Sequence, residues 1–203
     1  MTKERVSDDV INSVDSLSTN PIPVIYQSGY LTIKGYDERF KKYLLGFPNK
    51  EVEEGFLNFL LPLYCSAGDR SAFMVDEFVK DVETGHVEQF MNRLTAFFTD
   101  NNYQVAGEAE LYFQNAMYLV FKIMGFYTQV ERPTSDGRID AIIQTPNYIY
   151  VIECKLDRTA DEAIKQIENN GYAEPFLMDK RKLYKIGVSF SSETRGVAEY
   201  KIK

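Results

Sequence analysis

Hydrophobic residues in the second half of the chain alternate between helical and strand spacing. A mainly apolar stretch over residues 108–124 predicts a helix, and Gly125 follows as a residue type that commonly ends helices. Short apolar or alternating runs predict strands at residues 126–131, 138–144, 148–155, 183–190 and 197–202. A second helix is predicted between residues 159 and 171, begun by a capping box of Thr159 and Glu162. The order helix, three strands, helix, strand predicts an α/β sandwich around a mixed sheet.

The first 34 residues carry a shorter and less regular pattern. A short helix is predicted for residues 8–17. The prolines at 21 and 23 are expected to end it, because proline and the residue before it resist helix. Residues 24–34 have the pattern of two strand pieces around a Ser28-Gly29 turn.

A strand and a helix are predicted next. Residues 43–49 have a strand pattern that runs into a turn, and Asn49 is expected to cap a helix over residues 51–63. The N-terminal region is thus expected to be mainly helical, with either a winged-helix-like unit or a helical subdomain that carries a hairpin.

Residues 71–99 form a long amphipathic helical stretch that is interrupted near Gly85. Its apolar stripe is expected to lie either in the core or on a packing face between subdomains, and consists of Phe73, Phe78, Val82, Phe90, Leu94, Phe97 and Phe98. The pattern divides the chain into residues 1–70, a helical connector at 71–104, and an α/β domain at 105–203.

Composition narrows the chemistry that this chain can carry. Among 203 residues there are two cysteines, Cys65 and Cys154, and one histidine, His86. A disulfide framework, a cysteine zinc site and a histidine-based metal site are therefore not expected, and His86 is expected to be an ordinary surface residue. The absence of a long apolar run and of an apolar signal segment predicts a cytoplasmic protein without a membrane partner.

Charge is uneven along the chain. The formal net charge is −7. Residues 1–100 carry a balance of −6 and residues 101–203 a balance of −1. The second half also holds a basic cluster at Lys180, Arg181, Lys182 and Lys185. The acidic excess therefore lies outside the α/β region and does not exclude a nucleic-acid partner there.

Opposite charges end the most apolar predicted strand, at Glu153 and Lys155. Side chains alternate along a strand, so both point to one face and Cys154 points to the other. A two-residue loop at Pro146-Asn147 would pair Thr145 with Tyr148, and counting back along that hairpin places Asp140 opposite Glu153. Their Cβ atoms would lie about 4.5–5.5 Å apart, where two like charges are most easily held by a cation between them. A three-residue loop would offset the pair.

These residues resemble the motif of the PD-(D/E)XK nuclease superfamily, which has the restriction-endonuclease-like α/β/α fold. The match consists of Asp140 followed by Glu153-Cys154-Lys155, although Arg138-Ile139 stands where the nominal motif has proline. The wider pattern is similar to one bacterial subfamily in which this domain follows an AAA-type ATPase-like domain. That pattern comprises 110–114, 137–140, 153–155, 166–167, 171–173 and 186–190.

The resemblance implies a phosphodiester-hydrolysing site that uses Mg²⁺ or Mn²⁺ and acts on DNA or RNA. Asp140, Glu153 and the Cys154 carbonyl would ligate the metal, and Lys155 would orient the attacking water or offset charge on the phosphate. Glu110 would hold a second metal or a metal-bound water. In the plainer reading, Glu153 and Lys155 form a structural ion pair and Glu110 is a solvated carboxylate near a helix N-terminus.

Two further residues are candidates for substrate contact. Gln166 is similar to a polar residue that contacts substrate or the lysine in the family, and Arg138 could contact a phosphate. Their plainer readings are an exposed helix side chain and a salt bridge to the neighbouring carboxylates. Tyr172 is expected to pack in the core. Dimers are common in this fold, so a homodimer is one expectation.

Residues 1–70 resemble the end of the ATPase-like region, including its winged-helix-like part. No phosphate-binding loop of the form G-x-x-x-x-G-K-[ST] occurs, so ATP is not expected as a cofactor. A second reading follows, in which the nuclease fold is a catalytically inactive interaction or regulatory module of an ATPase-type protein.

Overall fold

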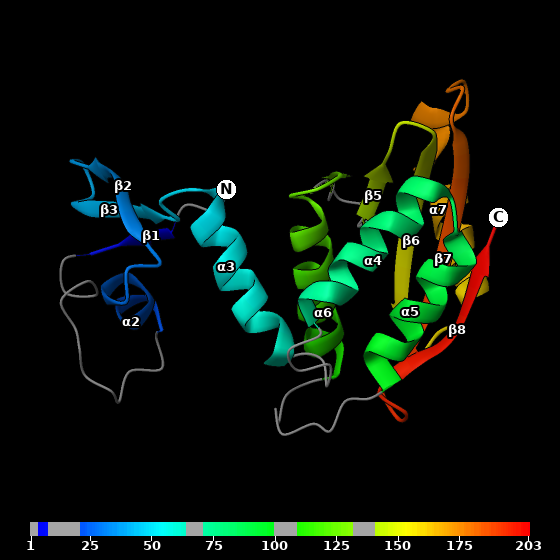
Figure 1. The fold of residues 1–203 in the computed structure, drawn as a ribbon, viewed down its shortest axis with the longest axis horizontal. Coiled ribbons are helices and arrows are strands. Elements are labelled where there is room, and N and C mark those ends of the chain that lie inside the picture. The colour runs from blue at the N-terminus through cyan, green and yellow to red at the C-terminus, as the bar shows by residue number, and fades with distance from the viewer. Residues whose placement is uncertain (1–3, 8–20, 64–70, 100–108, 132–140) are drawn as a thin grey trace. The chain divides into compact units, whose positions relative to one another are not determined.

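A computed structural model describes residues 4–7, 21–63, 71–99, 109–131 and 141–203. The chain divides into two compact units, Met1–Phe59 and Leu60–Lys203, each of which has its own sheet (Figure 1). No helix in the described ranges has the length and apolar character needed to cross a membrane.

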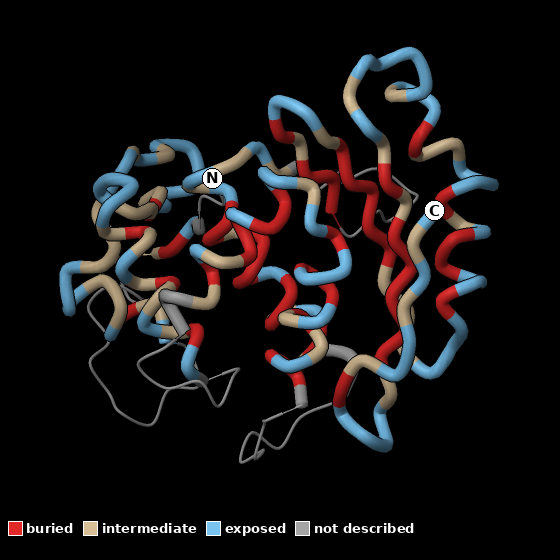
Figure 2. Tube along the Cα trace, turned by 45° about the vertical axis from the view of Figure 1, so that its right-hand side comes forward, coloured by how far each residue is buried: buried red, intermediate tan, exposed pale blue. Residues whose placement is uncertain are grey.

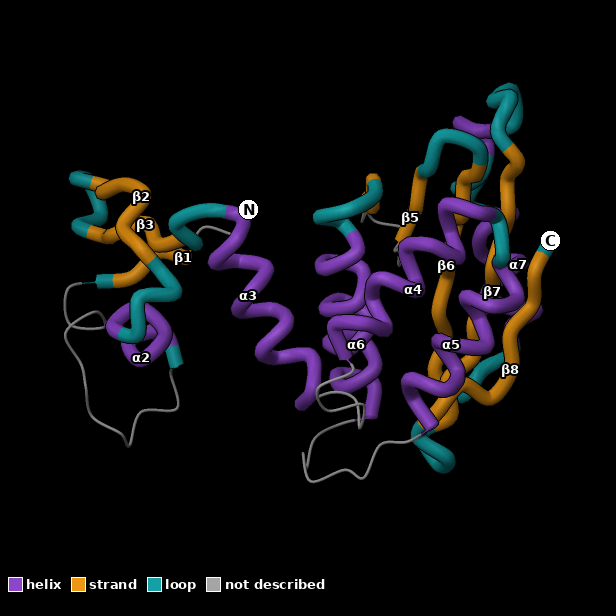
Figure 3. Tube along the Cα trace, in the orientation of Figure 1, coloured by secondary structure: helices purple, strands orange, loops and turns teal. Residues whose placement is uncertain are grey.

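A five-stranded mixed sheet forms the centre of the second unit. Its strands stand in the order β4-β5-β6-β7-β8, and Figure 3 shows β5 to β8 following one another across the sheet. Strands β6 and β7 run parallel, and the other neighbours are antiparallel. The strands are β4 (Gln129–Glu131), β5 (Ala141–Gln144), β6 (Tyr148–Leu156), β7 (Lys182–Ser191) and β8 (Gly196–Ile202). The mixed α/β architecture expected from the sequence is therefore present, and it is consistent with a restriction-endonuclease-like fold.

Helices cover both faces of this sheet (Figure 1). On one face, the buried Tyr150 hydroxyl of β6 donates to the Val82 carbonyl at 2.8 Å, and the Phe190 ring of β7 packs on Phe98 and Phe113. The helices on this face are α4 (Ser71–Thr84), α5 (Val87–Thr99) and α6 (Ala109–Met124). The other face is covered by α7 (Ala160–Asn169), whose Ile164 packs in a core cluster with β6. The central strands β5, β6 and β7 are largely buried between these two layers, whereas the described residues of the edge strands β4 and β8 are mostly half-buried or exposed (Figure 2).

The apolar stripe predicted over residues 71–99 lies in this core. Six of its seven members are no more than 2% exposed: Phe78, Val82, Phe90, Leu94, Phe97 and Phe98. The side chain of Phe73 lies outside the described residues. The interruption near Gly85 is the turn between α4 and α5, where Gly85 has a φ of 78°. A side chain there would overlap the ring of Tyr148, so the turn packs directly against the start of β6.

The crossover from β6 to β7 is made by α7. Thr159 caps this helix: its hydroxyl accepts from the Glu162 N–H, and the Glu162 carboxylate accepts from the Thr159 N–H, which confirms the predicted capping box. Gly171 follows α7 with a φ of 66°, a conformation that favours glycine. A short 3-10 turn, η3 (Glu174–Phe176), then leads to β7.

The first unit contains a three-stranded antiparallel sheet in the order β1-β3-β2. Its strands are β1 (Glu4–Val6), β2 (Thr32–Asp37) and β3 (Lys42–Gly46). Val6 and Leu45 are its buried centre, against which α2 (Ile22–Gln27) packs through Ile22 and Tyr26. Helix α3 (Lys50–Leu60) follows and leads into the 3-10 turn η1 (Leu61–Leu63). Asn49 accepts from the Val52 N–H at 2.9 Å, so its predicted role as a cap is confirmed.

The prediction of a strand piece at residues 24–27 is wrong, because these residues belong to helix α2. The two prolines do not block this helix, since Pro21 is its N-cap and Pro23 lies in its first turn, where backbone N–H groups have no intrahelical partner. Ser28-Gly29 is the end of α2 rather than a hairpin turn. Gly29 has a φ of 81° and donates to the Tyr26 carbonyl.

Two other predicted strands are seen only over part of their predicted ranges. The strand predicted at 126–131 is shortened to β4, and the strand predicted at 138–144 is described from Ala141 onward. The helix predicted at 8–17 lies outside the described residues. The division into residues 1–70, 71–104 and 105–203 stays a prediction.

Candidate functional site

Strand β6 lies third in the five-stranded sheet and places Glu153 and Lys155 on the face that α7 covers. Ile149 and Val151 of β6 pack in one cluster with Ile164 of α7. Because strand side chains alternate, Glu153 and Lys155 continue the same row toward the end of the strand. Cys154 belongs to the opposite row, and it is half-buried.

Glu153 is the most buried carboxylate in the described part of the chain, with 1% of its surface exposed. The Lys155 ammonium lies 2.7 Å from the Glu153 Oε1 atom. The Glu153 side chain is 2% exposed and the Lys155 side chain 19%. Burial of a carboxylate is costly unless a charge or hydrogen bonds compensate it. The plainer reading of these two residues, an ion pair at a strand end, is therefore realised in the structure. The ion pair also holds a carboxylate and an ammonium side by side at the end of β6, two groups that a catalytic site could use.

The hairpin of β5 and β6 has the register that the sequence predicts. Its ladder runs from Ala141↔Ile152 to Gln144↔Ile149, and the Thr145 N–H donates to the Tyr148 carbonyl at 2.9 Å. Two of the predicted site residues, Arg138 and Asp140, precede β5 and lie outside the described residues.

On the side away from β5, Glu153 and Lys155 are bordered by strand β7, and β8 lies beyond it. Glu153 is paired with Gly187, and Lys155 with Ser189. A Cβ at Gly187 would overlap the Ala160 carbonyl, so the glycine lets the start of α7 approach the sheet next to Glu153. The buried Ser189 hydroxyl donates to the Arg158 carbonyl, which fixes the turn after Lys155.

A carboxylate from β8 holds the first turn of α7 in this place. Glu199 is paired with Ser189 across the sheet, and its Oε1 accepts from the Ala160 N–H at 2.7 Å. Gly187, Ser189 and Glu199 were not predicted as neighbours of the site, because a sequence does not reveal the register of two parallel strands joined by a helix. The visible signal was a glycine and a serine within the apolar run 186–190.

The turn that follows β6 is pinned to the turn between β7 and β8. Asp157 has a φ of 52°, a rare conformation for a residue with a side chain. Its carboxylate accepts from the Ser192 hydroxyl at 2.6 Å and from the Ser192 N–H at 2.8 Å, and these bonds lower the pKa of Asp157. The end of β6 is thus anchored immediately beyond Lys155.

The remaining predicted residues are distributed around α6 and α7. Glu110 belongs to the first turn of α6, but its side chain lies outside the described residues. Gln166 is half-buried on α7. Tyr172 packs against the core cluster beneath α7 and its hydroxyl accepts from Asn170 at 2.6 Å, so its predicted packing role is confirmed.

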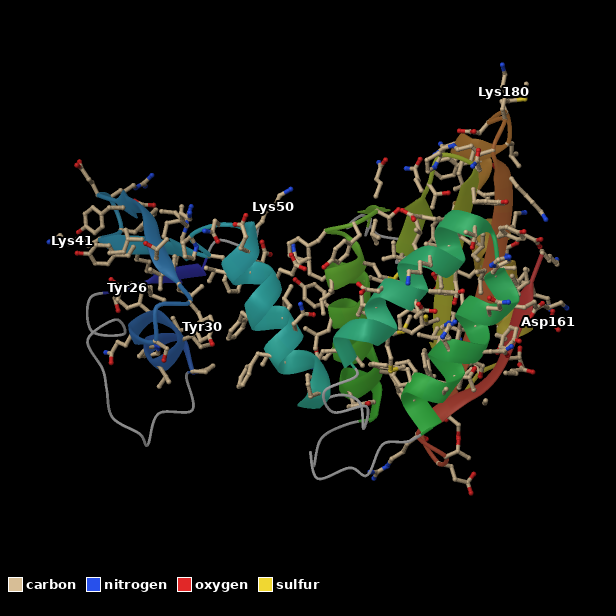
Figure 4. The ribbon with its side chains drawn as sticks, in the orientation of Figure 1. Tyr26, Tyr30, Lys41, Lys50, Asp161 and Lys180 are labelled. Atoms are coloured by element: carbon tan, nitrogen blue, oxygen red, sulfur yellow. The ribbon has the colours of Figure 1, made fainter. Side chains whose placement is uncertain are left out.

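The basic cluster is partly structural. Arg181 binds the Asp179 carboxylate at 2.7 Å and donates to the Gln144 side chain and the Thr145 carbonyl. Lys180 is exposed, and Figure 4 shows it at the tip of the segment between α7 and β7. His86 is exposed, as predicted, with its ring 3.0 Å from the Thr84 hydroxyl.

Within the described ranges, no group of three His, Cys, Asp or Glu side chains is placed to hold a metal ion. Of the three carboxylates expected at the metal, only Glu153 has a described side chain. The donor that is described is a buried carboxylate, the type of ligand that a hard cation prefers, and its Oε1 atom is paired with the Lys155 ammonium in this structure.

Comparison with known proteins shows which family the region around Glu153 and Lys155 is similar to. Residues 108–200 match the family model of the PD-(D/E)XK nuclease superfamily. The match extends from helix α6 to strand β8 and includes Glu153, Lys155 and Gln166.

A longer relative covers almost the whole chain. The chain is 28% identical over 205 residues to an uncharacterized protein in the vnfD 5′ region of Azotobacter chroococcum mcd 1. The alignment covers 94% of this chain and 38% of that protein, so the chain spans less than half the length of this relative. No solved structure matches the chain significantly.

Proposed function

We propose that this chain is a nuclease that hydrolyses nucleic-acid phosphodiesters with Mg²⁺ or Mn²⁺ through Asp140, Glu153 and Lys155. The observation that carries the proposal is the buried Glu153 carboxylate beside the Lys155 ammonium, at the end of a central strand. This strand belongs to the region that matches the nuclease superfamily. A buried pair of this kind costs desolvation energy, and active sites are where such groups are often retained.

The hairpin register supports Asp140 as the second carboxylate. Continuing the ladder by one residue from Ala141↔Ile152 would place Asp140 opposite Glu153. Ile142 packs in the α7 cluster, and Asp140 has the same parity along the chain, so its side chain would point to the face of Glu153. Two carboxylates at that spacing are suited to bind one divalent cation.

A hard divalent cation fits this donor set, with the Cys154 carbonyl and Glu110 as the other proposed ligands. When bound, it would activate a water molecule and stabilise charge on the phosphate. Glu153 would leave its contact with Lys155 to hold the cation, and the lysine would then donate to the attacking water or to the phosphate oxygen. Arg138 and Gln166 would bind and orient the nucleic-acid strand.

A cleavage assay tests this function. The full chain is incubated with single- and double-stranded DNA and RNA, with Mg²⁺, Mn²⁺ or EDTA. Cleavage that requires the metal is expected, and Glu153→Gln, Asp140→Asn and Lys155→Ala should each lower the rate by at least about 100-fold.

The matched control is Glu83→Gln, which neutralises an exposed carboxylate of α4 on the opposite face of the sheet. This variant should cleave at the wild-type rate. The proposal fails if the wild type neither cleaves any of the four substrates nor binds Mn²⁺ in a calorimetric titration.

A second candidate is an inactive interaction or regulatory module. It is favoured by the closed Glu153–Lys155 ion pair, which is complete without a metal, and by the relative that extends well beyond this chain. In this reading the first unit is a winged-helix-like part of an ATPase-type protein, and its antiparallel order β1-β3-β2 with a β2–β3 hairpin is compatible with that description. The cleavage assay separates the two candidates, and a sizing experiment on the same sample tests a homodimer.

A further inference from the structure

The hairpin of β2 and β3 in the first unit presents cations and aromatic rings together on its outer end. We call this group the hairpin tip and define it as Tyr36, Arg39, Phe40, Lys41 and Lys42. All five residues are exposed, with Tyr36 at 49% and Phe40 at 56%. The tip lies in the half of the chain that carries most of the acidic excess, so its basic character is local.

The three cations of the tip are available to a ligand. Within the described part of the chain, Arg39, Lys41 and Lys42 form no ion pair. The Asp37 carboxylate, which precedes these cations in the sequence, is already engaged elsewhere. One of its oxygens lies 3.7 Å from the Arg5 guanidinium, and the other accepts from the Phe40 N–H at 3.1 Å. Glu38 is the one other carboxylate of the turn, so the tip retains a positive balance.

The aromatic rings are held by contacts on one side and open to solvent on the other. The Tyr36 ring packs on Tyr43 with centroids 4.8 Å apart, and the Arg39 guanidinium lies over the Phe40 ring at 5.1 Å. These contacts orient the rings while leaving about half of each exposed. Single exposed apolar side chains are common on protein surfaces, so the distinguishing feature of the tip is that its two exposed rings lie among cations.

Backbone geometry at the tip gives a second indication. Lys41 has a φ of 50°, where glycine or asparagine is far less strained than lysine. A turn selected only for its shape would favour glycine at this position. A long cation in this left-handed conformation agrees with a use for the cation itself, because strained backbone often marks functional sites.

We infer that the hairpin tip binds single-stranded nucleic acid, with Tyr36 and Phe40 stacking on unpaired bases and Arg39, Lys41 and Lys42 contacting the phosphates. Stacking rings interleaved with cations are the means by which proteins bind single strands without reading their sequence. Bases in a duplex do not offer their faces to such rings, which is why a single strand is the occupant that fits. This binding goes beyond the proposed cleavage and does not depend on it.

Fluorescence anisotropy of the full chain tests the inference. The probes are labelled oligothymidine DNA and oligouridine RNA of about 15 nucleotides, a length within the range of single-strand binding sites. EDTA is present, so the result does not depend on whether the chain cleaves. Phe40→Ala is expected to weaken binding by about 5- to 100-fold, which is the loss of one stacked base.

A combined Arg39→Gln, Lys41→Gly and Lys42→Gln variant tests the phosphate contacts. Removing three contacts to a single strand should lower the slope of log affinity against log salt by about 2. The glycine relieves the left-handed strain at position 41, so the turn is expected to keep its shape, and thermal unfolding checks this. The control is Lys50→Gln, an exposed lysine that Figure 4 shows at the other end of this unit from Lys41.

Three results would overturn the inference. The first is an unchanged affinity and salt slope in the tip variants. The second is equal binding of a duplex of the same length with no effect of Phe40→Ala. The third is binding to phosphatidylserine vesicles and to neither oligonucleotide, since exposed rings and cations also suit an anionic membrane surface. A difference between the DNA and RNA probes identifies which strand the tip prefers.

Discussion

Single residues decide whether the Glu153–Lys155 pair is only structural. With Glu153 almost wholly buried, removal of the ammonium 2.7 Å away takes a compensating charge from a desolvated carboxylate. Lys155→Ala is therefore expected to lower the free energy of unfolding by about 3–5 kcal/mol without divalent metal. If a cation binds at Glu153, saturating Mg²⁺ or Mn²⁺ should restore much of this loss, because a bound ligand stabilises the folded state. Urea unfolding with and without the metal measures both effects.

The matched control uses an exposed pair of similar geometry. The Lys80 ammonium lies 2.9 Å from a Glu77 oxygen, and the lysine side chain is 64% exposed. Lys80→Ala should change stability little, because solvent screens surface ion pairs, and it should show no extra response to metal. Equal metal responses of the two variants would mean that no cation binds at Glu153.

A residue-scale effect of pH is expected at Asp179. Its hydrogen bonds to Arg181 lower its pKa from 3.8 to about 2. A carboxyl with a lowered pKa stabilises the folded state above the pKa of the unfolded chain, and this contribution is lost as pH falls toward the folded value. The melting temperature of wild type should therefore exceed that of Asp179→Asn at pH 5, and the difference should shrink between about pH 4 and pH 2. A gap that stays constant over this range would show that the ion pair contributes nothing.

At the scale of elements, the close packing of α7 on β7 fixes the place of the site. A Cβ at Gly187 would overlap the Ala160 carbonyl and lie 3.0 Å from an Ile164 side-chain carbon. Gly187→Ala should therefore destabilise the second unit by about 1–3 kcal/mol, the usual range for overpacking of a core.

The same substitution at an open glycine provides the control. Gly55 lies within helix α3, and a Cβ there would meet nothing within 4 Å. Gly55→Ala should stabilise the chain by about 0.5–1 kcal/mol, because alanine loses less conformational entropy in a helix. Denaturant unfolding of the two variants should give shifts of opposite sign. A neutral Gly187→Ala would show that α7 can move away from the sheet at little cost.

Local chemistry explains which elements the sequence predicted well. The capping box of Thr159 and Glu162 and the hairpin of β5 and β6 depend on residues within a few positions of one another, and both are present as predicted. The β-branched residues of the segment 22–27 were misleading, because their helix is begun by prolines and packed by a distant strand. The residue that β7 places beside Glu153, and the β8 carboxylate that holds the start of α7, depend on non-local pairing, which local patterns do not contain.

At the scale of the whole molecule, the sequence suggests that residues 71–104 connect two parts, whereas α4 and α5 contribute to the core of the second unit. Phe78, Phe90 and Leu94 are fully buried, and the Phe98 ring packs on Phe190 of the sheet. A fragment of residues 105–203 would expose this face of the sheet to water, while a fragment of residues 60–203 would keep it covered. We expect the longer fragment to unfold cooperatively and the shorter one to aggregate or bind a hydrophobic dye strongly. Circular dichroism melts and dye fluorescence of both fragments measure this, and a shorter fragment that melts as cooperatively as the longer one would show that the helical segment is a connector after all.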